Sequence, residues 1–177
     1  MYRQRKYSKT ESDFIETQLK TLVDSGVIRP SKSEWASHFV IVKKKDSTLR
    51  LSIDYRDLNS VTLRDPYPLP NITDVHNRMS DCKYFTCLDV TSAYWQVPVN
   101  EADIPKTGFT TPYGNYEWMR MPFGLVNAAS TFQRIMDGAF GDMRDEGKPY
   151  QDDVTIYSKT WDTHIAALPK FCPDFGL

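Results

Sequence analysis

Three aspartates are the side chains of this sequence whose type and spacing are best suited to chemistry. Asp89 lies near the end of an apolar run over residues 84–90, which predicts a buried strand. Asp152 and Asp153 are adjacent and precede another strand-like run. An unpaired carboxylate in an apolar strand is costly, and neighbouring carboxylates repel each other unless a cation or solvent separates them. A turn that brought the pair beside Asp89 would therefore create an all-oxygen site suited to Mg²⁺.

The chemistry of such a site is phosphoryl transfer. Two bound ions can activate an attacking hydroxyl group and stabilise the leaving group of an in-line displacement. The alternative is that Asp152 and Asp153 simply form a polar turn, because aspartate is frequent in turns. The residue types alone leave both interpretations open.

The elements that would position these residues mix helices and strands irregularly. Apolar spacing predicts a helix over residues 11–23, with Gly26 suited to its C-terminal cap. Ser8 followed by Glu11, or Thr10 and Ser12, could start this helix. Strict alternation over residues 49–55, after the strand-like residues 39–42, predicts a β-hairpin with a basic tip. We also expect a second hairpin around Tyr113-Gly114-Asn115, a short helix over 72–79, and a helix capped by Asn127 whose apolar stripe is Ala128, Phe132, Ile135, Met136 and Ala139. This irregular order favours an α+β fold over a doubly wound sheet.

Composition and charge narrow the class of protein. The 177 residues are 40% hydrophobic and 13% aromatic, as in a globular protein. No apolar run is long enough for a membrane span and no secretory signal is visible, so we expect a soluble intracellular protein. The net charge of −1 argues against binding nucleic acid by bulk charge alone. Basic residues are nevertheless clustered within residues 3–9 and 43–50.

A series of short motifs runs through almost the whole chain. They include Val42-Lys43-Lys44-Lys45-Asp46, Arg50-Leu51-Ser52-Ile53-Asp54-Tyr55-Arg56-Asp57-Leu58-Asn59, Asp65-Pro66-Tyr67-Pro68-Leu69-Pro70, Tyr84-Phe85-Thr86-Cys87-Leu88-Asp89-Val90, Met121-Pro122-Phe123-Gly124-Leu125 and Tyr150-Gln151-Asp152-Asp153. In this order and spacing the sequence resembles the reverse transcriptases of Gypsy-type LTR retrotransposons, over roughly residues 10 to 168.

The resemblance implies the fingers and palm of a polymerase. The palm would hold a ferredoxin-like mixed sheet packed on helices, and the thumb would be absent. Residues 1–65 would form part of the fingers, with the N-terminal helix and the basic hairpin. Residues 66–168 would form the palm with the catalytic aspartates, with some fingers interleaved around 95–125. Residues 169–177 would be a truncated tail.

The same resemblance assigns the metal site. Asp89 and Asp152 would bind Mg²⁺, with Mn²⁺ as an alternative, and the carbonyl of Val90 would be a further ligand. Asp153 would lie near the primer terminus. All three aspartates would therefore be catalytic.

The nucleotide site follows from the resemblance as well. Lys44 and Arg50 would hold the triphosphate, together with the backbone of Ser92 and Ala93. Tyr94 would be the steric gate that excludes a ribose hydroxyl group.

The resemblance also assigns roles to residues of the nucleotide pocket and of the template-facing fingers. Phe123 would form the floor of the nucleotide pocket. Asp54, Arg56 and Tyr67-Pro68 would belong to the template-facing fingers, with contacts to the backbone and stacking faces of the template.

The sequence also departs from the family pattern. Gln151 stands where an apolar residue is usual, and Ala129 replaces a proline. Gly147 and Pro149 are poor residues for a central strand, which predicts that the strand before Asp152 is short, displaced or missing.

The expected function is that of an RNA-directed DNA polymerase domain of a retrotransposon polyprotein, a nucleotidyltransferase that adds dNTPs to a primer on an RNA or DNA template. We expect a truncated or weakly active copy, without the thumb and RNase H of the polyprotein, in the cytoplasm or in virus-like particles. The alternative is a non-catalytic nucleic-acid-binding remnant of a decayed retroelement.

Overall fold

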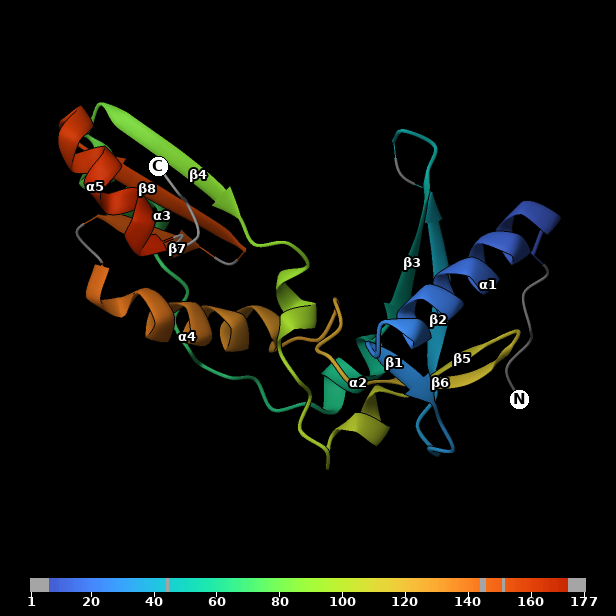
Figure 1. Ribbon diagram of the computed structural model, residues 1–177. Coiled ribbons are helices and arrows are strands. Elements are labelled where there is room, and N and C mark those ends of the chain that lie inside the picture. Colours follow the sequence, from blue (N-terminus) through green and yellow to red (C-terminus); the bar gives the residue numbers. More distant parts are fainter. Residues whose placement is uncertain (1–6, 44, 144–145, 151, 172–177) are drawn as a thin grey trace. The chain divides into compact units, whose positions relative to one another are not determined.

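The computed structural model describes residues 7–43, 45–143, 146–150 and 152–171 (Figure 1). The chain divides into two compact units. Unit 1 comprises Met1–Arg64 and Tyr94–Ala128, and unit 2 comprises Asp65–Ala93 and Ala129–Leu177. Each unit contains a β-sheet and helices, which confirms the α+β class. Among the described residues, no helix is both long and apolar enough to cross a membrane.

Unit 1 begins with helix α1 (Lys9–Asp24), which the sequence predicted almost to its ends. Ser8 and Glu11 form a capping box, in which each side chain accepts a hydrogen bond from the other residue's backbone N–H. Gly26 follows the helix with a φ of +67°, a left-handed conformation that glycine adopts without steric cost. The helix buries Ile15, Leu19 and Leu22.

The sheet of unit 1 has five strands in the order β1-β6-β5-β2-β3. These are β1 (Ile28–Pro30), β2 (Ser37–Lys43), β3 (Leu49–Asp54), β5 (Phe109–Thr111) and β6 (Gly114–Trp118). Both predicted hairpins are confirmed, because β2 pairs with β3 and β5 pairs with β6 in antiparallel register. The pair β2 and β5 is parallel, so this sheet is mixed. The short helices of the unit are α2 (Arg56–Val61), η1 (Ala93–Gln96) and η2 (Ile104–Thr107).

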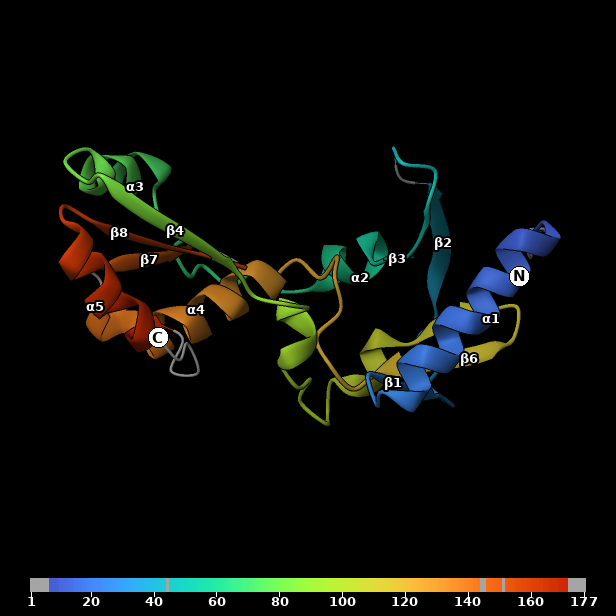
Figure 2. The same ribbon diagram turned by 45° about the horizontal axis from the view of Figure 1, so that its top comes forward.

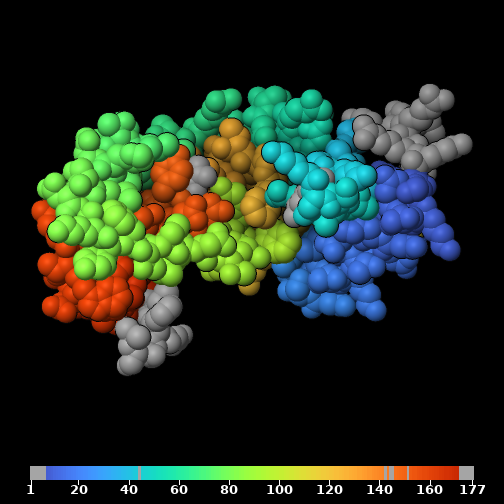
Figure 3. All heavy atoms as spheres, turned by 90° about the horizontal axis from the view of Figure 1, so that it is seen from above, coloured from blue at the N-terminus to red at the C-terminus, as the bar shows by residue number. Residues whose placement is uncertain are grey.

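The core of unit 1 lies between α1 and the sheet. Ile15 and Leu19 of the helix pack with Phe39, Ile53 and Phe109 of the strands in one buried cluster. Figure 3 shows α1, in blue, directly beside the cyan residues of the β2–β3 hairpin. Burial of this apolar surface is the main force that holds the helix against the sheet.

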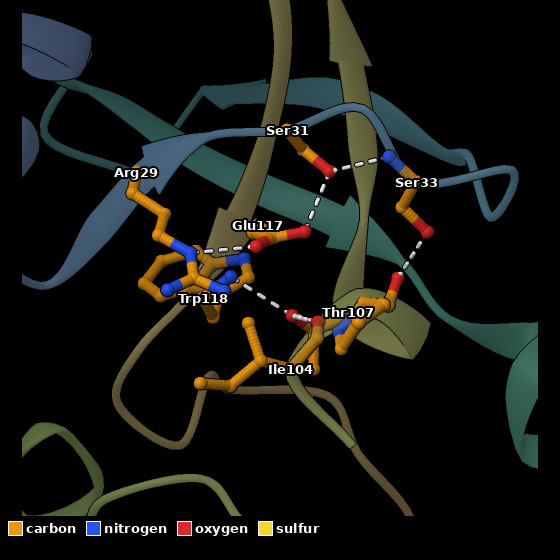
Figure 4. Close-up of polar contacts among 8 residues, drawn as sticks. Arg29, Ser31, Ser33, Ile104, Thr107, Glu117 and Trp118 are labelled. Carbon is orange, nitrogen blue, oxygen red and sulfur yellow. Dashed lines mark hydrogen bonds and ion pairs between the residues drawn. The ribbon is translucent and has the colours of Figure 1, made fainter. Parts of the chain in front are cut away.

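A buried acidic side chain joins the edge of this sheet to its neighbours (Figure 4). Glu117 on β6 is only 5% exposed; its carboxylate accepts from Arg29 Nε at 2.6 Å and from Ser31 Oγ at 2.6 Å. The next residue, Trp118, donates its backbone N–H to Thr107 Oγ1 at 2.8 Å. A buried carboxylate needs such partners, and these bonds hold β6 between β1 and η2.

Unit 2 is a three-stranded sheet with helices on both faces. The order is β4 (Tyr84–Asp89), β8 (Asp153–Ser158) and β7 (Gly147–Tyr150), and both pairings are antiparallel. Figure 2 shows α3 (Ile72–Met79) on one face, and α4 (Ala128–Phe140) and α5 (Trp161–Phe171) on the other. A short turn of helix, η3 (Gly141–Met143), follows α4. The structure thus contains the expected mixed sheet packed on helices, which is the sheet of unit 1, and an antiparallel sheet in unit 2 that carries the aspartates.

Strand β7 corrects the expectation that this segment is displaced or missing. It is short, with four residues, but it pairs with β8 in register. Pro149 is tolerated because β7 is an edge strand, where one side of the backbone needs no partner in the sheet. Gly147 is required by packing, since a Cβ atom there would lie 2.6 Å from Cζ of Phe171 and 3.2 Å from the carbonyl oxygen of Thr155.

Two burial predictions in unit 2 were wrong. Strand β4 is not buried but alternates, with Phe85, Cys87 and Asp89 exposed, because only one face of this edge strand is covered by α5. In α4 the predicted stripe holds for Phe132 and Met136, while Ile135 is 45% exposed and Ala139 is also exposed.

A buried histidine links α5 to the sheet. His164 is 3% exposed; its Nε2 lies 2.8 Å from Thr86 Oγ1 on β4, and its Nδ1 lies 3.3 Å from Ser158 Oγ on β8. These contacts reach both strands of the β4–β8 pair. The helix therefore supports the alignment of the two strands against each other.

Gly147 and Gly138 provide a matched test of this packing. Gly147→Ala should lower the free energy of unfolding by about 1–3 kcal/mol, because the added methyl group overlaps the Phe171 ring. Gly138 lies in α4 with no atom within 4 Å of its ideal Cβ position, so Gly138→Ala should raise that free energy by about 0.5–1 kcal/mol. Urea unfolding of both variants measures the difference. Equal stability of Gly147→Ala and the unmodified chain would contradict the described packing of β7 on α5.

Candidate active site

The pairing of β4 with β8 brings the predicted aspartates to one end of the sheet of unit 2. Asp89 and Asp153 are direct partners in the register, so their side chains lie side by side on the same face. The backbone N–H of Val90 donates to the carbonyl oxygen of Asp152 at 2.8 Å, just beyond the paired strands. The three residues predicted for the metal site, Asp89, Val90 and Asp152, thus come together with the predicted catalytic residue Asp153 through backbone geometry.

The two facing carboxylates are both exposed. Like charges directly opposite each other on neighbouring strands are unfavourable, and a cation between them would remove that cost. Among the described residues, no group of three or more His, Cys, Asp or Glu side chains is placed to hold a metal ion. The donor chemistry nevertheless fits Mg²⁺, because carboxylate and carbonyl oxygens are the ligands that this ion takes.

Strand β7, which precedes Asp152, is supported by a residue that the sequence analysis did not identify. Gln133 of α4 is fully buried and donates from Nε2 to the carbonyl oxygen of Pro149 at 3.3 Å and to Asp137 Oδ1 at 3.1 Å. Asp137 also accepts from the hydroxyl group of Tyr67 at 2.8 Å. The signal in the sequence that could have revealed Gln133 is its position as a polar residue within the apolar stripe of α4.

Tyr67 was expected to face the template, and in unit 2 it has partners of its own. Besides the bond to Asp137, its ring lies under the guanidinium group of Arg134, 4.7 Å from Cζ to the ring centroid. Arg134 in turn donates to both carboxylate oxygens of Asp65, at 2.8 and 2.7 Å. These contacts hold the extended segment around Asp65 and Tyr67 against α4.

Three residues predicted to bind the nucleotide meet in unit 1. The ring of Phe123 lies 5.0 Å from that of Tyr94, centroid to centroid, and the guanidinium carbon of Arg50 lies 5.2 Å from the Phe123 centroid. Trp95 completes the cluster at 6.2 Å from Phe123. The arrangement provides one cation and an aromatic wall. Another residue predicted to bind the nucleotide, Lys44, lies outside the described residues.

The backbone of Ser92 and Ala93 follows the end of β4. Ser92 has a φ of +51°, a left-handed conformation that is uncommon for a residue other than glycine and is often found at functional sites. Ala93 is buried, and its backbone N–H donates to the carbonyl oxygen of Val90 at 3.1 Å. A carbonyl oxygen has two lone pairs, so Val90 retains capacity for a second partner.

Asp54 and Arg56 form an ion pair with each other. The hydrogen bonds donated by the Arg56 side chain, followed by that of its backbone N–H, lower the pKa of the Asp54 carboxyl group to about 2. Asp54 is therefore ionised at neutral pH. The guanidinium group of Arg56 is 87% exposed and can reach a further anion.

The predicted site residues belong to both units. Asp89, Val90, Ser92, Ala93, Asp152 and Asp153 lie in unit 2, and Arg50, Tyr94 and Phe123 lie in unit 1.

Comparison with known proteins identifies relatives across most of the chain. The model of the family described as "Reverse transcriptase (RNA-dependent DNA polymerase)" matches residues 42–172. The retrovirus-related Pol polyprotein from transposon opus of Drosophila melanogaster is 42% identical over 159 residues, which are 85% of this chain and 16% of that polyprotein. The corresponding polyprotein from transposon gypsy is 40% identical over 87% of this chain, and the enzymatic polyprotein of Cauliflower mosaic virus (strain CM-1841) is 35% identical over 97% of it.

Solved structures have the same fold at lower identity. The foamy viral protease-reverse transcriptase in complex with RNA/DNA hybrid matches 96% of this chain and 23% of its own, with a TM-score of 0.86 and 21% identity. A second structure of the foamy viral enzyme, in complex with ds DNA, has a TM-score of 0.84. The chain spans 16% of the length of the Drosophila polyproteins named above. On the family match and these identities, this chain belongs to the reverse transcriptase family, with retrotransposon Pol polyproteins, gypsy among them, as relatives.

Proposed function

We propose that this chain forms the fingers and palm of a retrotransposon reverse transcriptase and adds dNTPs to a primer on an RNA or DNA template. The observation that carries the proposal is the placement of Asp89 opposite Asp153, with Asp152 bonded to Val90 through the backbone. Unit 1 corresponds to the fingers and unit 2 to the palm in this assignment. The partners are the primer-template, dNTPs and the remainder of the polyprotein, and the setting is the cytoplasm or a virus-like particle.

Asp89, Asp152 and the carbonyl of Val90 are the groups that would hold Mg²⁺, or Mn²⁺ in its place. When bound, two such ions supply charge stabilisation for the attacking and leaving oxygens of an in-line displacement. Asp153 lies beside Asp89 and adds negative charge at the point where the primer terminus would lie. Asp89 and Asp153 are held by the β4–β8 pairing, and Val90 and Asp152 by the backbone hydrogen bond just beyond it, so the arrangement needs little reorganisation.

The remaining residues select and hold the nucleotide. Arg50 is a cation with five N–H donors that suit triphosphate oxygens, and Lys44 would add a compact charge. The backbone of Ser92 and Ala93 would contact the same phosphates.

The sugar and base would meet the aromatic cluster of unit 1. Tyr94 would select the sugar, since its ring would occupy the space of a ribose 2′-hydroxyl group. Phe123 would form the floor on which the nucleotide rests. The 5.0 Å contact between the two rings supports this division of roles, because it limits the movement of the Tyr94 ring.

The first test measures the metal directly. Asp89→Asn should remove the repulsion from Asp153, so in EDTA the variant should be at least as stable as the unmodified chain. Mg²⁺ should raise the melting temperature of the unmodified chain and raise that of Asp89→Asn less, because binding to the folded state stabilises it. Asp13→Asn, an exposed change on α1, is the control and should respond to Mg²⁺ like the unmodified chain. An equal Mg²⁺ response in all three proteins would refute the metal site.

The second test measures catalysis by primer extension on an RNA template with Mg²⁺. Incorporation by the chain, or by the chain joined to the thumb of a relative, should fall by about 100-fold or more in Asp152→Asn, because charge stabilisation of this kind has effects of that size. Asp13→Asn should retain activity.

Unchanged incorporation in Asp152→Asn would exclude the proposed role of Asp152. Salt-sensitive binding of nucleic acid without any metal-dependent incorporation would favour the alternative, a non-catalytic binding remnant. The departures at Gln151 and in β7 are the features of the sequence that favour this alternative.

The third test addresses sugar selection in the same assay. Tyr94→Val should increase the ratio of ribonucleotide to deoxynucleotide incorporation by about tenfold or more. A loss of about 1.4 kcal/mol in the free energy that discriminates against ribonucleotides corresponds to tenfold. Tyr94→Phe keeps the ring and should keep the selectivity. Tyr113→Val, in the β5–β6 hairpin, is the control. An unchanged ratio in Tyr94→Val would mean that another group selects the sugar.

A further inference from the structure

Strand β7 leads directly into the turn that carries Asp152. Tyr150 of β7 pairs with Asp153 of β8, so Asp152 is the second of the two residues between the paired positions. β7 lies at the edge of the sheet, with β8 as its neighbour. The position of Asp152 therefore depends on how firmly the outer side of β7 is held.

The carbonyl group of Pro149 points to that outer side. Tyr157 donates its backbone N–H to the carbonyl oxygen of Glu146 at 2.9 Å, which makes these two residues a hydrogen-bonded pair. Such pairs alternate along an antiparallel ladder, so at the pair of Pro149 and Val154 the backbone groups point away from the partner strand. The side chain of Gln133 supplies a donor to this carbonyl oxygen, from Nε2 at 3.3 Å.

Asp137 determines the orientation of the Gln133 amide. The Nε2 atom of Gln133 carries two hydrogens, and its acceptors are the carbonyl oxygen of Pro149 and, at 3.1 Å, Oδ1 of Asp137. A flipped amide would place its own oxygen against both acceptors. The carboxylate of Asp137 therefore selects the orientation in which the amide reaches β7. Gln133 is fully buried, so solvent does not substitute for these bonds.

Asp137 is itself held from two further segments. Its Oδ2 accepts from the hydroxyl group of Tyr67 at 2.8 Å, and Nζ of Lys148 on β7 lies 4.0 Å from Oδ1. The Asp137 side chain is only 17% exposed, and these donors offset the cost of removing its charge from water. One carboxylate thus joins three parts of unit 2, which are the segment before α3, helix α4 and strand β7.

We infer that Asp137 is a positioning residue for the metal site. Through Gln133 it holds the outer side of β7, and it thereby fixes the place of Asp152 relative to Asp89. An error of about 1 Å in the position of a reacting group can lower a rate about 100-fold, so such support affects more than stability. The inference rests on the proposed function in so far as Asp152 binds a metal ion; the support of β7 by Asp137 does not.

The first measurement follows the turn directly by hydrogen exchange of backbone amides in the ¹⁵N-labelled full chain. Val90 is the reporter, because its N–H donates to Asp152. Asp137→Leu removes an acceptor of the Gln133 amide and should speed exchange of this N–H about tenfold or more. The amide of Ile156, a fully buried residue of the central strand β8, should keep its rate. Equal acceleration of both amides would show a role in general stability and would overturn the inference.

Milder variants keep the inference open to refutation if Asp137→Leu does not fold. Asp137→Asn retains the volume but has one acceptor oxygen for two donors, and Tyr67→Phe removes a single hydroxyl group. Each should speed exchange of the Val90 amide by about two- to fivefold. Asp162→Leu, an exposed change of the same kind on α5, is the control and should leave the rate unchanged.

The second measurement separates positioning from stability through the metal. The affinity for Mg²⁺, followed by the shift of the Val90 amide signal, should be about fivefold or more weaker in Asp137→Leu and unchanged in Asp162→Leu. In primer extension at limiting Mg²⁺, kcat should fall about tenfold in Asp137→Leu while KM for dTTP stays within about twofold. Added Mg²⁺ should restore much of the activity of Asp137→Leu but not that of Asp152→Asn.

The outcomes separate this inference from the proposed function. Unchanged exchange of the Val90 amide in the Asp137 and Tyr67 variants would overturn the inference. Faster exchange with unchanged Mg²⁺ affinity would overturn it as well, because the turn would then move without consequence for the metal. If no protein binds Mg²⁺ or extends a primer while Asp137→Leu still speeds Val90 exchange alone, the result counts against the proposed function and supports the hold of Asp137 on β7.

Discussion

The register of β4 against β8 determines which side chains can meet at the end of the three-stranded sheet. Side chains alternate between the two faces of a strand, so a slip by one residue would move Asp89 to the face opposite Asp153. His164 contacts both strands from α5, and Gln133 bonds the edge strand from α4. The contacts from α4 and α5 thus help to specify the alignment of the strands, and the pairing places the exposed carboxylates of Asp89 and Asp153 side by side.

The candidate site in unit 2 combines two arrangements that are unfavourable in themselves. Two carboxylates face each other across β4 and β8, and Ser92 has a left-handed backbone conformation. Proteins retain such features where function requires them, and the surrounding structure supplies the stability. In unit 2 this support comes from the helices packed on the sheet. These features lie where ligands are proposed to bind.

Local patterns were enough to predict most of the elements. The capping box at Ser8, the period of α1, the alternation of β3 and the turn around Gly114 all act over a few residues, and the structure agrees with them. Burial was harder to predict. An apolar run looks the same whether both faces of a strand are covered or only one, which is why β4 was wrongly expected to be buried. Pro149 was misjudged for a related reason, since its cost depends on whether its strand is central or at an edge.

The sequence by itself determined the family and the α+β class, and it predicted the three aspartates, because these follow from residue types and their order along the chain. Tertiary structure alone decided that Asp89 faces Asp153, that Gln133 bonds to strand β7, and that Arg50 lies over Phe123. Each of these is a contact between segments far apart in the chain. Such contacts depend on strand register and on the packing of helices, neither of which is encoded in any short stretch of residues.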